Sequence, residues 1–343
     1  MLIDKNGSDV HIVVGMPPTL RVDGELLPIE GVGDLNQKTA ETLINPLMTQ
    51  EQKDYVKVNK ELDFAYQYKN LGRFRTNVYH SRGNMAAALR LIPTKIRHFD
   101  ELNLPNVFSE FIHYKQGLVL VTGPTGEGKS TTLAAMLEEI NRTRAEHIIT
   151  IEDPIEFLYE SKMSVISQRE INHDTHGWDI SLRSCLREDP DIVLIGEMRD
   201  FETIASAITI AETGHLVFAT LHTASAAQTI DRIIDVFPAH QQAQIRQQLA
   251  STLKVVASQR LLHKVGGGRV PALEVMVANS AIRNLIREGK THQIDNIIQT
   301  SQDQGMTLIE NHLADLFNKG LITKEDAYFT AFRYQEMQRI FGE

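Results

Sequence analysis

The sequence predicts an α/β fold with two domains, on three observations. The chain has 343 residues, which is more than a single hydrophobic core usually holds. From Gly117 onward, apolar runs of strand length alternate with helical patterns, as expected for a parallel sheet covered by helices on both faces. Ahead of Pro93, shorter strand patterns are separated by turn-forming dipeptides, which indicates a smaller mixed sheet.

Composition narrows the class of protein further. With 42% hydrophobic and 23% charged residues, the chain has the make-up of a globular protein rather than a disordered one. Its apolar runs fall well short of the roughly 20 residues that cross a bilayer, and its first residues lack a signal-peptide pattern. We therefore expect a cytoplasmic location without a transmembrane segment. A single cysteine, Cys185, forms neither an internal disulfide nor a zinc site alone. The net charge of −9 disfavours nucleic acid as a partner, except through a local basic groove.

The first domain, residues 1–95, is expected to be a small sheet with helices. Strand-length stretches around the Pro17-Pro18 and Asp23-Gly24 turns predict strands at His11–Val14, Thr19–Val22, Glu25–Leu27, Asp63–Tyr68, Gly72–Tyr79 and Met85–Ile92. Helical spacing of apolar residues predicts a helix over Thr39–Val58, interrupted near Pro46. Residues 96–115 have a mixed polar pattern and are expected to connect the domains as a hinge.

Residues 116–288 are expected to form an α/β nucleotide-binding core. Buried strands are predicted at Leu118–Thr122, His147–Ile151, Ile192–Ile195 and Leu216–Thr220, with helices at Lys129–Asn141, Ser181–Glu188 and Phe201–Glu212. A long helix past Ala239 is predicted to carry Ile245, Leu249, Leu253, Val256 and Leu261, before a strand at Ala272–Ala278. Further helices are predicted at about 280–288, 306–319 and 323–340, so residues 289–343 form a carboxy-terminal helical region.

A glycine-rich segment between the first core strand and its helix fits the phosphate-loop pattern G-x-x-x-x-G-K-[ST]. It consists of Gly123, Pro124, Thr125, Gly126, Glu127, Gly128, Lys129 and Ser130, followed by Thr131. Backbone N–H groups and the helix start would hold phosphates, Lys129 would neutralise them and Ser130 would place its hydroxyl on Mg²⁺. The alternative is a glycine-rich turn with an accidental Lys-Ser. A carboxylate at Glu127 would repel a triphosphate unless it points to solvent.

Two acidic clusters follow strands of the predicted core. Glu152, Asp153 and Glu156 lie at the end of the second strand, on the sheet edge where ligands of open α/β sheets bind, or else form a solvated acidic turn. The strand Ile192–Ile195 resembles a Walker B strand, with Gly196 at the usual aspartate position and Glu197 after it. Glu197 is thus the candidate to orient or deprotonate the attacking water and to reach Mg²⁺ through water. A structural ion pair with Arg199 is the alternative.

Histidines lie near both ends of the fourth core strand. His215 and His222 are too far apart on an extended strand to share a metal, so zinc is not expected. His222, at the carboxyl end, is a candidate to hydrogen-bond the γ-phosphate and report its presence. Capping of the next helix is the alternative role.

These clusters carry a resemblance to a known family. GPTGEGKSTTL, IEDPIEF, DPDIVLIGEMRD and TGHLVFATLHT resemble, in order, the Walker A, Asp, Walker B and His boxes of the secretion-superfamily hexameric ATPases. SDVHIVVGMPPTLRVDGEL and GRFRTNVYHSRG resemble the first domain of that family. The segment 281–288 resembles the AIRNLIRE signature of its branch that retracts type IV pili. The resemblance implies a PAS-like amino-terminal domain and a RecA-like ATPase core, with ATP and Mg²⁺ as cofactors.

The resemblance also implies residue roles. Lys129, Ser130 and Thr131 would bind phosphate and Mg²⁺, the Asp-box carboxylates would line the site, and Glu197 would be the catalytic base. Arg75 and Arg90 match first-domain arginines that clamp phosphates, and Arg183 and Arg187 match a pair near the subunit boundary. The i, i+4 spacing independently suggests that Arg183 and Arg187 share a helix face. For each arginine, a solvated surface position is the alternative.

The function that the resemblance implies is a homohexameric motor that retracts type IV pili and drives twitching motility. Its first domain would move against the core as ATP binds and is hydrolysed. It would act peripherally at the cytoplasmic face of the inner membrane, on a platform protein at the pilus base, with the 281–288 segment in a coupling role. Two alternatives are a related motor of type II secretion or DNA uptake, and a nucleotide-gated adaptor without turnover.

Overall fold

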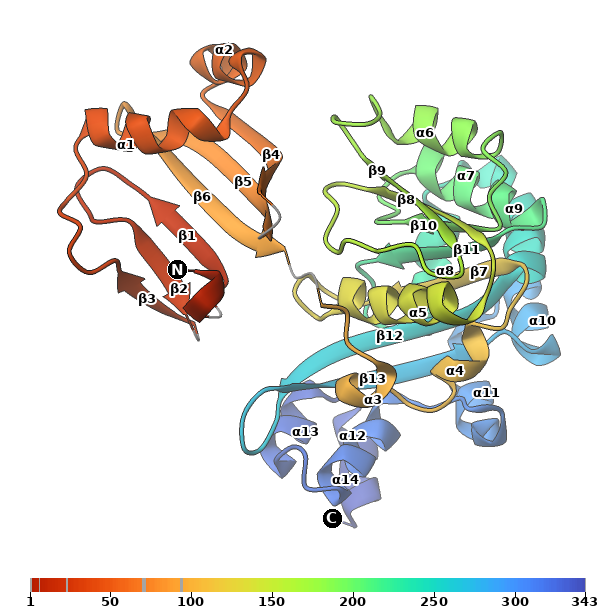
Figure 1. Ribbon diagram of the computed structural model, residues 1–343. Coiled ribbons are helices and arrows are strands. Elements are labelled where there is room, and N and C mark those ends of the chain that lie inside the picture. Colours follow the sequence, from red (N-terminus) through yellow and green to blue (C-terminus); the bar gives the residue numbers. More distant parts are fainter. Residues whose placement is uncertain (1, 6, 23, 70–71, 93–94, 343) are drawn as a thin grey trace. The chain divides into compact units, whose positions relative to one another are not determined.

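The computed structural model describes residues 2–5, 7–22, 24–69, 72–92 and 95–342, and the chain divides into two compact units (Figure 1). The first unit consists of Met1–Lys95 with Glu156–Leu158, and the second of Ile96–Ile155 with Tyr159–Glu343. Two sequence predictions, the turn residue Asp23 and Pro93 ahead of the connection, lie outside the described residues.

The first unit contains a sheet in the order β3-β2-β1-β6-β5-β4, in which neighbouring strands are antiparallel. Its strands are β1 Asp9–Ile12, β2 Thr19–Val22, β3 Glu25–Pro28, β4 Glu61–Tyr68, β5 Gly72–Ser81 and β6 Asn84–Ile92. Its helices are η1 Ile3–Lys5, α1 Gln37–Ile44, η2 Asn45–Leu47 and α2 Gln50–Asn59. The predicted interruption near Pro46 is confirmed, because η2 separates α1 from α2.

One face of this sheet is apolar and the other is polar. Along β5, Phe74 and Val78 are buried while Arg75 between them is exposed, which is the two-residue alternation of a half-covered strand. The helix α1 packs on the apolar face, where Ile44 is fully buried, and Figure 1 shows α1 beside β6. Arginines of β5 and β6 therefore project from the face opposite α1.

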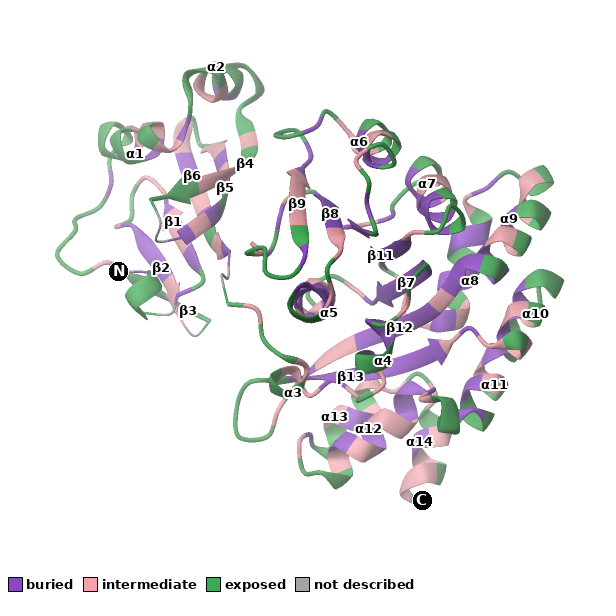
Figure 2. Ribbon diagram, turned by 45° about the vertical axis from the view of Figure 1, so that its right-hand side comes forward, coloured by how far each residue is buried: buried purple, intermediate pink, exposed green. Residues whose placement is uncertain are grey.

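The second unit contains a mostly parallel sheet in the order β13-β12-β7-β11-β10-β8-β9, with β13 antiparallel to β12 at one edge. Its strands are β7 Gly117–Thr122, β8 His147–Glu152, β9 Val165–Glu170, β10 Ile192–Ile195, β11 Leu216–Leu221, β12 Leu253–His263 and β13 Arg269–Val277. The residues of β7, β10 and β11 are all buried, and Figure 2 shows β7 and β11 in purple. This confirms the predicted α/β core of buried parallel strands.

The helices of the second unit begin in the segment predicted to connect the domains. They are α3 Phe99–Leu102, α4 Phe108–Phe111, α5 Lys129–Thr143, α6 Trp178–Cys185, α7 Phe201–Glu212, α8 Ala226–Asp235, α9 Ala239–Thr252, α10 Ser280–Glu288, η3 Thr291–Gln293, α11 Ile294–Thr300, η4 Gln302–Gln304, α12 Ile309–Asn318, α13 Lys324–Thr330 and α14 Tyr334–Phe341. Phe108 and Phe111 of α4 are buried in the same cluster as Val119 and Met136. The segment 96–115 thus packs against the core sheet over part of its length.

Three predicted helices need correction. The long helix past Ala239 ends at Thr252, and residues 253–263 form strand β12 beside β7. Leu253 and Val256 continue the helical spacing of α9, but β12 is buried in the sheet, and tertiary packing overrides the local pattern. The predicted helix 323–340 is two helices, α13 and α14. The predicted helix Ser181–Glu188 starts and ends earlier, as α6.

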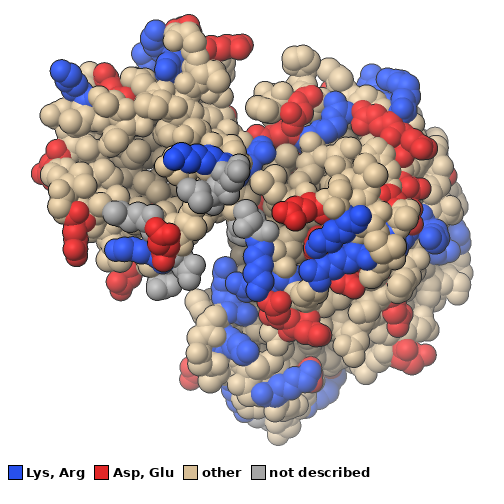
Figure 3. All heavy atoms as spheres, viewed as in Figure 1, with Lys and Arg blue, Asp and Glu red and all other residues tan. Residues whose placement is uncertain are grey.

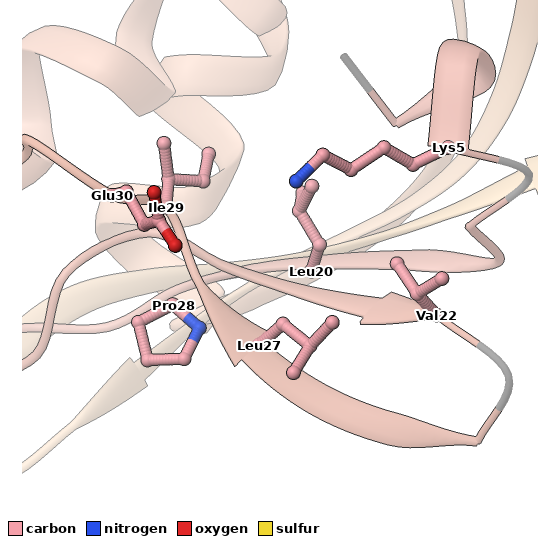
Figure 4. A pocket seen from close by; sticks show the side chains of 7 residues that line it. All are labelled: Lys5, Leu20, Val22, Leu27, Pro28, Ile29 and Glu30. Carbon is pink, nitrogen blue, oxygen red and sulfur yellow. The ribbon is translucent and has the colours of Figure 1, made fainter.

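The surface of the described residues has three features. No described helix is both long enough and apolar enough to span a bilayer. On the face drawn in Figure 3, Lys and Arg are interspersed with Asp and Glu. In the first unit, a hollow of about 260 Å³ is lined by Leu20, Val22, Leu27, Pro28, Ile29, Lys5 and Glu30 (Figure 4). None of the site residues predicted from the sequence lines this hollow.

Candidate active site

The phosphate loop joins β7 to α5, as the sequence predicted. Gly123, Gly126 and Gly128 have φ angles of +142°, +86° and +79°, which residues other than glycine rarely adopt. Lys129 is buried, and its Nζ donates to the carbonyl oxygens of Gly123 at 2.7 Å and Pro124 at 2.8 Å. Its ammonium group therefore lies inside the curve of the loop. Ser130 and Thr131 follow in the first turn of α5, and both are half-buried.

The carboxyl ends of β8 and β10 bring the acidic clusters to one sheet edge. Ile151 and Ile195 are paired in register, so Glu152 and Gly196 follow side by side. Glu152 is 7% exposed and accepts a hydrogen bond from the Thr150 hydroxyl at 2.7 Å. A Cβ on Gly196 would lie 3.3 Å from Cα of Glu152, which leaves little room for a side chain at the usual Walker B aspartate position.

Asp153 and Glu156 occupy the exposed loop after β8. Asp153 lies close enough to Arg199 for its charge to help raise the pKa of that guanidinium, behind the larger effect of the hydrogen bond from Arg199 to Glu197. Of the three Asp-box carboxylates, Glu152 is therefore fixed in the sheet, while Asp153 and Glu156 face solvent.

Glu197 is the meeting point of three sequence motifs. Its Oε2 lies 2.7 Å from an Nη of Arg199, and its Oε1 lies 2.8 Å from Nε2 of His222. The other ring nitrogen of His222, Nδ1, lies 3.5 Å from the hydroxyl of Thr125 in the phosphate loop. Walker A, Walker B and His-box residues thus form one chain of contacts. Burial pushes the pKa of Glu197 up, but the hydrogen bond from Arg199 and the charge of His222 outweigh it and hold the pKa below its usual value.

Of the two alternative roles, the structure contains the ion pair of Glu197 with Arg199 but not the helix cap by His222. The ion pair between Glu197 and Arg199 is present, and it coexists with the contact to His222. The N-cap of α8, the helix after β11, is Ser225, whose hydroxyl accepts the Gln228 N–H at 3.3 Å. Capping of that helix by His222 is therefore wrong.

The paired placement of Arg183 and Arg187 on one helix face is also wrong. Arg183 is exposed on α6, but α6 ends at Cys185, and Arg187 lies in the turn that follows. The Arg187 N–H donates to the carbonyl of Ser184 at 2.9 Å. A residue directly before a proline is disfavoured in the helical conformation, so Pro190 favours a helix stop ahead of it. Asp189 is accordingly not helical and has a φ of +54°.

Arg75 and Arg90 are direct neighbours on the polar face of the first unit. They are paired across β5 and β6, where two like charges repel each other. Nε of Arg90 donates to Oδ1 of Asp9 at 2.8 Å, and the side chain of Arg90 remains 69% exposed. Asp9 in turn accepts the Ser8 hydroxyl at 2.7 Å and lies 4.0 Å from Arg21. Burial raises the pKa of Asp9, but the hydrogen bonds from Ser8 and Arg90 outweigh this and leave the pKa below its usual value.

Two residues that contact predicted functional residues escaped the sequence analysis. Asp9 pairs with Arg90 only because β1 lies beside β6, a register that local sequence does not reveal. Gln259 contacts the phosphate loop from β12, a strand that we predicted as helix. A polar Gln-Arg pair within an apolar strand would have been the signal, had β12 been recognised as extended.

The donor set fits Mg²⁺. The hydroxyl of Ser130 and the carboxylate of Glu197 are hard oxygen donors, and Mg²⁺ usually takes one or two such protein ligands together with phosphate oxygens and water. An ionised Glu197 can hold a water of that shell, which agrees with the low pKa of its carboxyl group.

Comparison with known proteins identifies the family. The model of the family described as type II/IV secretion system protein matches residues 3–328. The chain belongs to this family. It is 49% identical to the type IV pilus retraction ATPase PilT of Pseudomonas aeruginosa, over 94% of each chain. It is 46% identical to a twitching motility protein of Neisseria gonorrhoeae, over 90% of this chain and 83% of the relative.

A solved structure supports the same family assignment. The crystal structure of the pilus retraction motor PilT with bound ADP superposes with a TM-score of 0.93 at 45% identity, covering 98% of this chain and 96% of the other. The predicted α/β fold, with an amino-terminal domain and an ATPase core, is confirmed. The recognition of a secretion-superfamily ATPase from its four motifs, and of the retraction branch from the 281–288 segment, is confirmed as well.

Proposed function

We propose that this chain is a Mg²⁺-dependent ATPase that powers the retraction of type IV pili and thereby twitching motility. The convergence of Thr125, Glu197 and His222 at the end of the parallel sheet carries the proposal of hydrolysis. Open α/β sheets bind their ligands at this edge. The similarity to PilT over nearly the whole chain supports the assignment to pilus retraction.

The phosphate loop would bind ATP through backbone N–H groups and the start of α5. Lys129 would turn from the loop carbonyls to the β- and γ-phosphates, and Ser130 would place its hydroxyl on Mg²⁺. The loop members that we assign to this role are Gly123, Pro124, Thr125, Gly126, Gly128, Lys129, Ser130 and Thr131. The bound Mg²⁺ would neutralise phosphate charge as it develops during transfer.

Glu197 would accept a hydrogen bond from the attacking water. Because its pKa lies below the usual value, the carboxylate is ionised at neutral pH but is a weak base. Orienting the water, rather than removing its proton fully before attack, is the role that this pKa supports. His222 connects Glu197 to Thr125 and would sense whether a γ-phosphate is present. Glu152, Asp153 and Glu156 would line the same edge.

Arginines would supply the remaining positive charge. We assign Arg75 and Arg90 to a clamp on the terminal phosphate in the assembled motor, and Arg183 and Arg187 to the subunit boundary. The motor would be a homohexamer of four-part subunits: residues 1–95, the hinge 96–115, the ATPase core 116–288 and the helical region 289–343. Loss of the γ-phosphate on hydrolysis would release the clamp, so the first domain would move against the core.

The partner would be an inner-membrane platform protein at the pilus base, which the motor contacts from the cytoplasmic side. The helix α10 presents Asn284 and Arg287 to solvent while Ile282 and Ile286 anchor it in the core. This amphipathic arrangement supports a coupling role for the 281–288 segment.

One pair of measurements tests the proposed function. The purified chain should hydrolyse ATP in the presence of Mg²⁺ and lose this activity as Glu197→Gln. The wild-type gene, but not the Glu197→Gln gene, should restore twitching in a bacterium that lacks its own retraction ATPase. Absence of turnover would favour the nucleotide-gated adaptor. Turnover with restored protein secretion and no restored twitching would favour a secretion motor.

A further inference from the structure

The phosphate loop contacts three consecutive residues of β12, which we call the β12 clamp: Gln259, Arg260 and Leu261. The amide of Gln259 joins two parts of the loop region. Its Nε2 donates to the carbonyl of Glu127 at 2.5 Å, and its Oε1 accepts the hydroxyl of Thr132 in α5 at 2.7 Å. Gln259 is 3% exposed, so both hydrogen bonds are shielded from water.

The backbone of the clamp is packed against the glycines of the loop. A Cβ on Gly123 would lie 2.3 Å from the carbonyl oxygen of Gln259, which no real side chain tolerates. A Cβ on Gly128 would lie 3.0 Å from Nε2 of Gln259. Gly123 is therefore required by the strand next to the loop as well as by its own φ angle, and Gly128 packs tightly against the Gln259 side chain.

Glu127 completes the contact and resolves a difficulty in the sequence. Its Oε2 accepts the Leu261 N–H at 2.5 Å, and its Oε1 lies 3.6 Å from the guanidinium of Arg260. The carboxylate that would repel a triphosphate is thus bound to β12 instead of pointing to solvent. Arg260 also lies over the ring of Phe332, with its guanidinium carbon 5.3 Å from the ring centroid.

We propose that Gln259 and Glu127 are positioning residues for nucleotide binding: through the β12 clamp they hold the phosphate loop in its phosphate-binding shape before the nucleotide arrives. This inference rests on the proposed function, since it assumes that the loop binds ATP and ADP. A loop fixed in advance loses less conformational freedom on binding, so the clamp increases affinity without touching the ligand. Both nucleotides use the loop, so the effect applies equally to the ground state and the transition state. The clamp therefore acts on KM rather than kcat.

The test compares variants that lose a hydrogen bond between β12 and the phosphate loop with a variant that loses a hydrogen bond from β12 to another strand. Gln259→Leu keeps the size of the side chain but removes both hydrogen bonds, and Glu127→Ala removes the acceptor of the Leu261 N–H. Glu127→Gln keeps an acceptor at that position and serves as the conservative rescue. Ser258→Ala is the control, because Ser258 is buried next to Gln259 but hydrogen-bonds Thr122 of β7 at 2.8 Å.

We expect Gln259→Leu and Glu127→Ala to raise the Kd for a fluorescent ADP and the KM for ATP about tenfold, with kcat within about twofold. Glu127→Gln and Ser258→Ala should keep wild-type values of both, although Ser258→Ala should lower the Tm without nucleotide. The clamp is refuted if Gln259→Leu and Glu127→Ala keep wild-type Kd and KM. It is also refuted if these two variants lower kcat instead of raising KM, or if Ser258→Ala raises Kd and KM to the same extent. Should Gln259→Leu fail to fold, Glu127→Ala alone decides. A wild-type chain that binds neither nucleotide would instead refute the proposed function.

Discussion

The two units of this molecule hold their functional polar side chains in opposite ways. In the second unit, Lys129 and Gln259 are buried and hydrogen-bonded to the phosphate loop. In the first unit, Arg75 and Arg90 stand side by side on an exposed sheet face. Among the residues that the structure describes, the carboxylate of Asp9 holds Arg90 through a hydrogen bond.

The difference teaches which part of the site is preformed and which part is available to move. A loop held by buried, hydrogen-bonded side chains has its shape before a ligand arrives and changes little on binding. An exposed arginine with one weak counterion can exchange that partner for a phosphate at small cost. In the proposed motor, the core unit would bind the nucleotide and the arginine face would respond to it.

The largest expected effect comes from removing the exposed arginine. Arg90→Ala should reduce kcat about 10³- to 10⁵-fold, the range for arginine fingers in phosphoryl transfer, while the Kd for ADP stays near the wild-type value. Steady-state ATPase assays with an ADP titration measure both. Arg21→Ala is the control, because Arg21 lies on the same face beside Asp9. Near-normal turnover of Arg90→Ala would show that the arginine face takes no part in hydrolysis.

Glu197→Gln should reduce kcat about 10²- to 10⁴-fold, because the amide cannot take the role of the carboxylate toward water. ATP binding should persist, so the variant should trap ATP in a filter-binding assay. Glu188→Gln, which breaks the ion pair of Glu188 with Arg169 in the same unit, should keep normal turnover. Undiminished phosphate release from Glu197→Gln would move the water-orienting role to the Asp box.

Sequence reasoning found the local parts of the site and missed those made by strand pairing. The phosphate loop, Glu197 and His222 lie within continuous motifs whose strand and helix context is readable from apolar patterns. Asp9 reaches Arg90 through the register of β1 with β6, and Gln259 reaches the phosphate loop through the register of β12 with β7. Such registers join residues far apart in the chain, and no local pattern encodes them.

The same limit explains the errors in fold. Leu249, Leu253 and Val256 keep helical spacing, yet only the first belongs to a helix. The second and third are buried in the sheet, where hydrogen bonding to β7 decides the conformation. The break between α13 and α14 similarly depends on Glu310 of α12, which accepts the backbone N–H groups of Phe332 and Arg333 at 3.1 Å and 2.9 Å.

A smaller effect is expected from a change to Asp9, the counterion of Arg90. Asp9→Asn should leave kcat within about twofold, because Arg90 leaves Asp9 when it reaches the terminal phosphate, and should instead lower the free energy of unfolding through loss of the charge-assisted hydrogen bond. The low pKa of Asp9 means that its stabilising contribution is present above the unfolded pKa of about 3.9 and is lost as pH falls through the folded value. Unfolding of Asp9→Asn should thus differ from wild type at pH 7 and converge with it in acid. A constant difference down to pH 2 would contradict this pairing.

The last expected effect is on stability within the core unit rather than on turnover. Glu274 is fully buried, and its Oε1 accepts the Ala226 N–H at 2.8 Å. Burial raises its pKa to about 7, with Asp295, Glu310 and Arg333 nearby. Because the folded pKa exceeds the unfolded one, the wild type should lose up to about 1.4 kcal/mol per pH unit as pH rises from about 4 to 7.

Urea unfolding of wild type and Glu274→Gln across this pH range measures that slope. His312 opposes it, because burial lowers the pKa of its imidazole to about 4, so its contribution is lost as pH falls from about 6.5 to 4. Glu274→Gln should therefore gain stability relative to wild type as pH rises. A difference independent of pH would show that Glu274 is ionised in the folded protein.

A crystal structure of the assembled protein with Mg²⁺ and a non-hydrolysable ATP analogue tests the central claim most directly. The account predicts that Gln259 still contacts Glu127 and Thr132, while Arg90 has left Asp9 and lies within hydrogen-bond distance of a terminal phosphate. If Arg90 remained on Asp9, with no arginine of the first unit near a terminal phosphate in any subunit, the proposed division between a preformed loop and a responsive arginine face would be wrong.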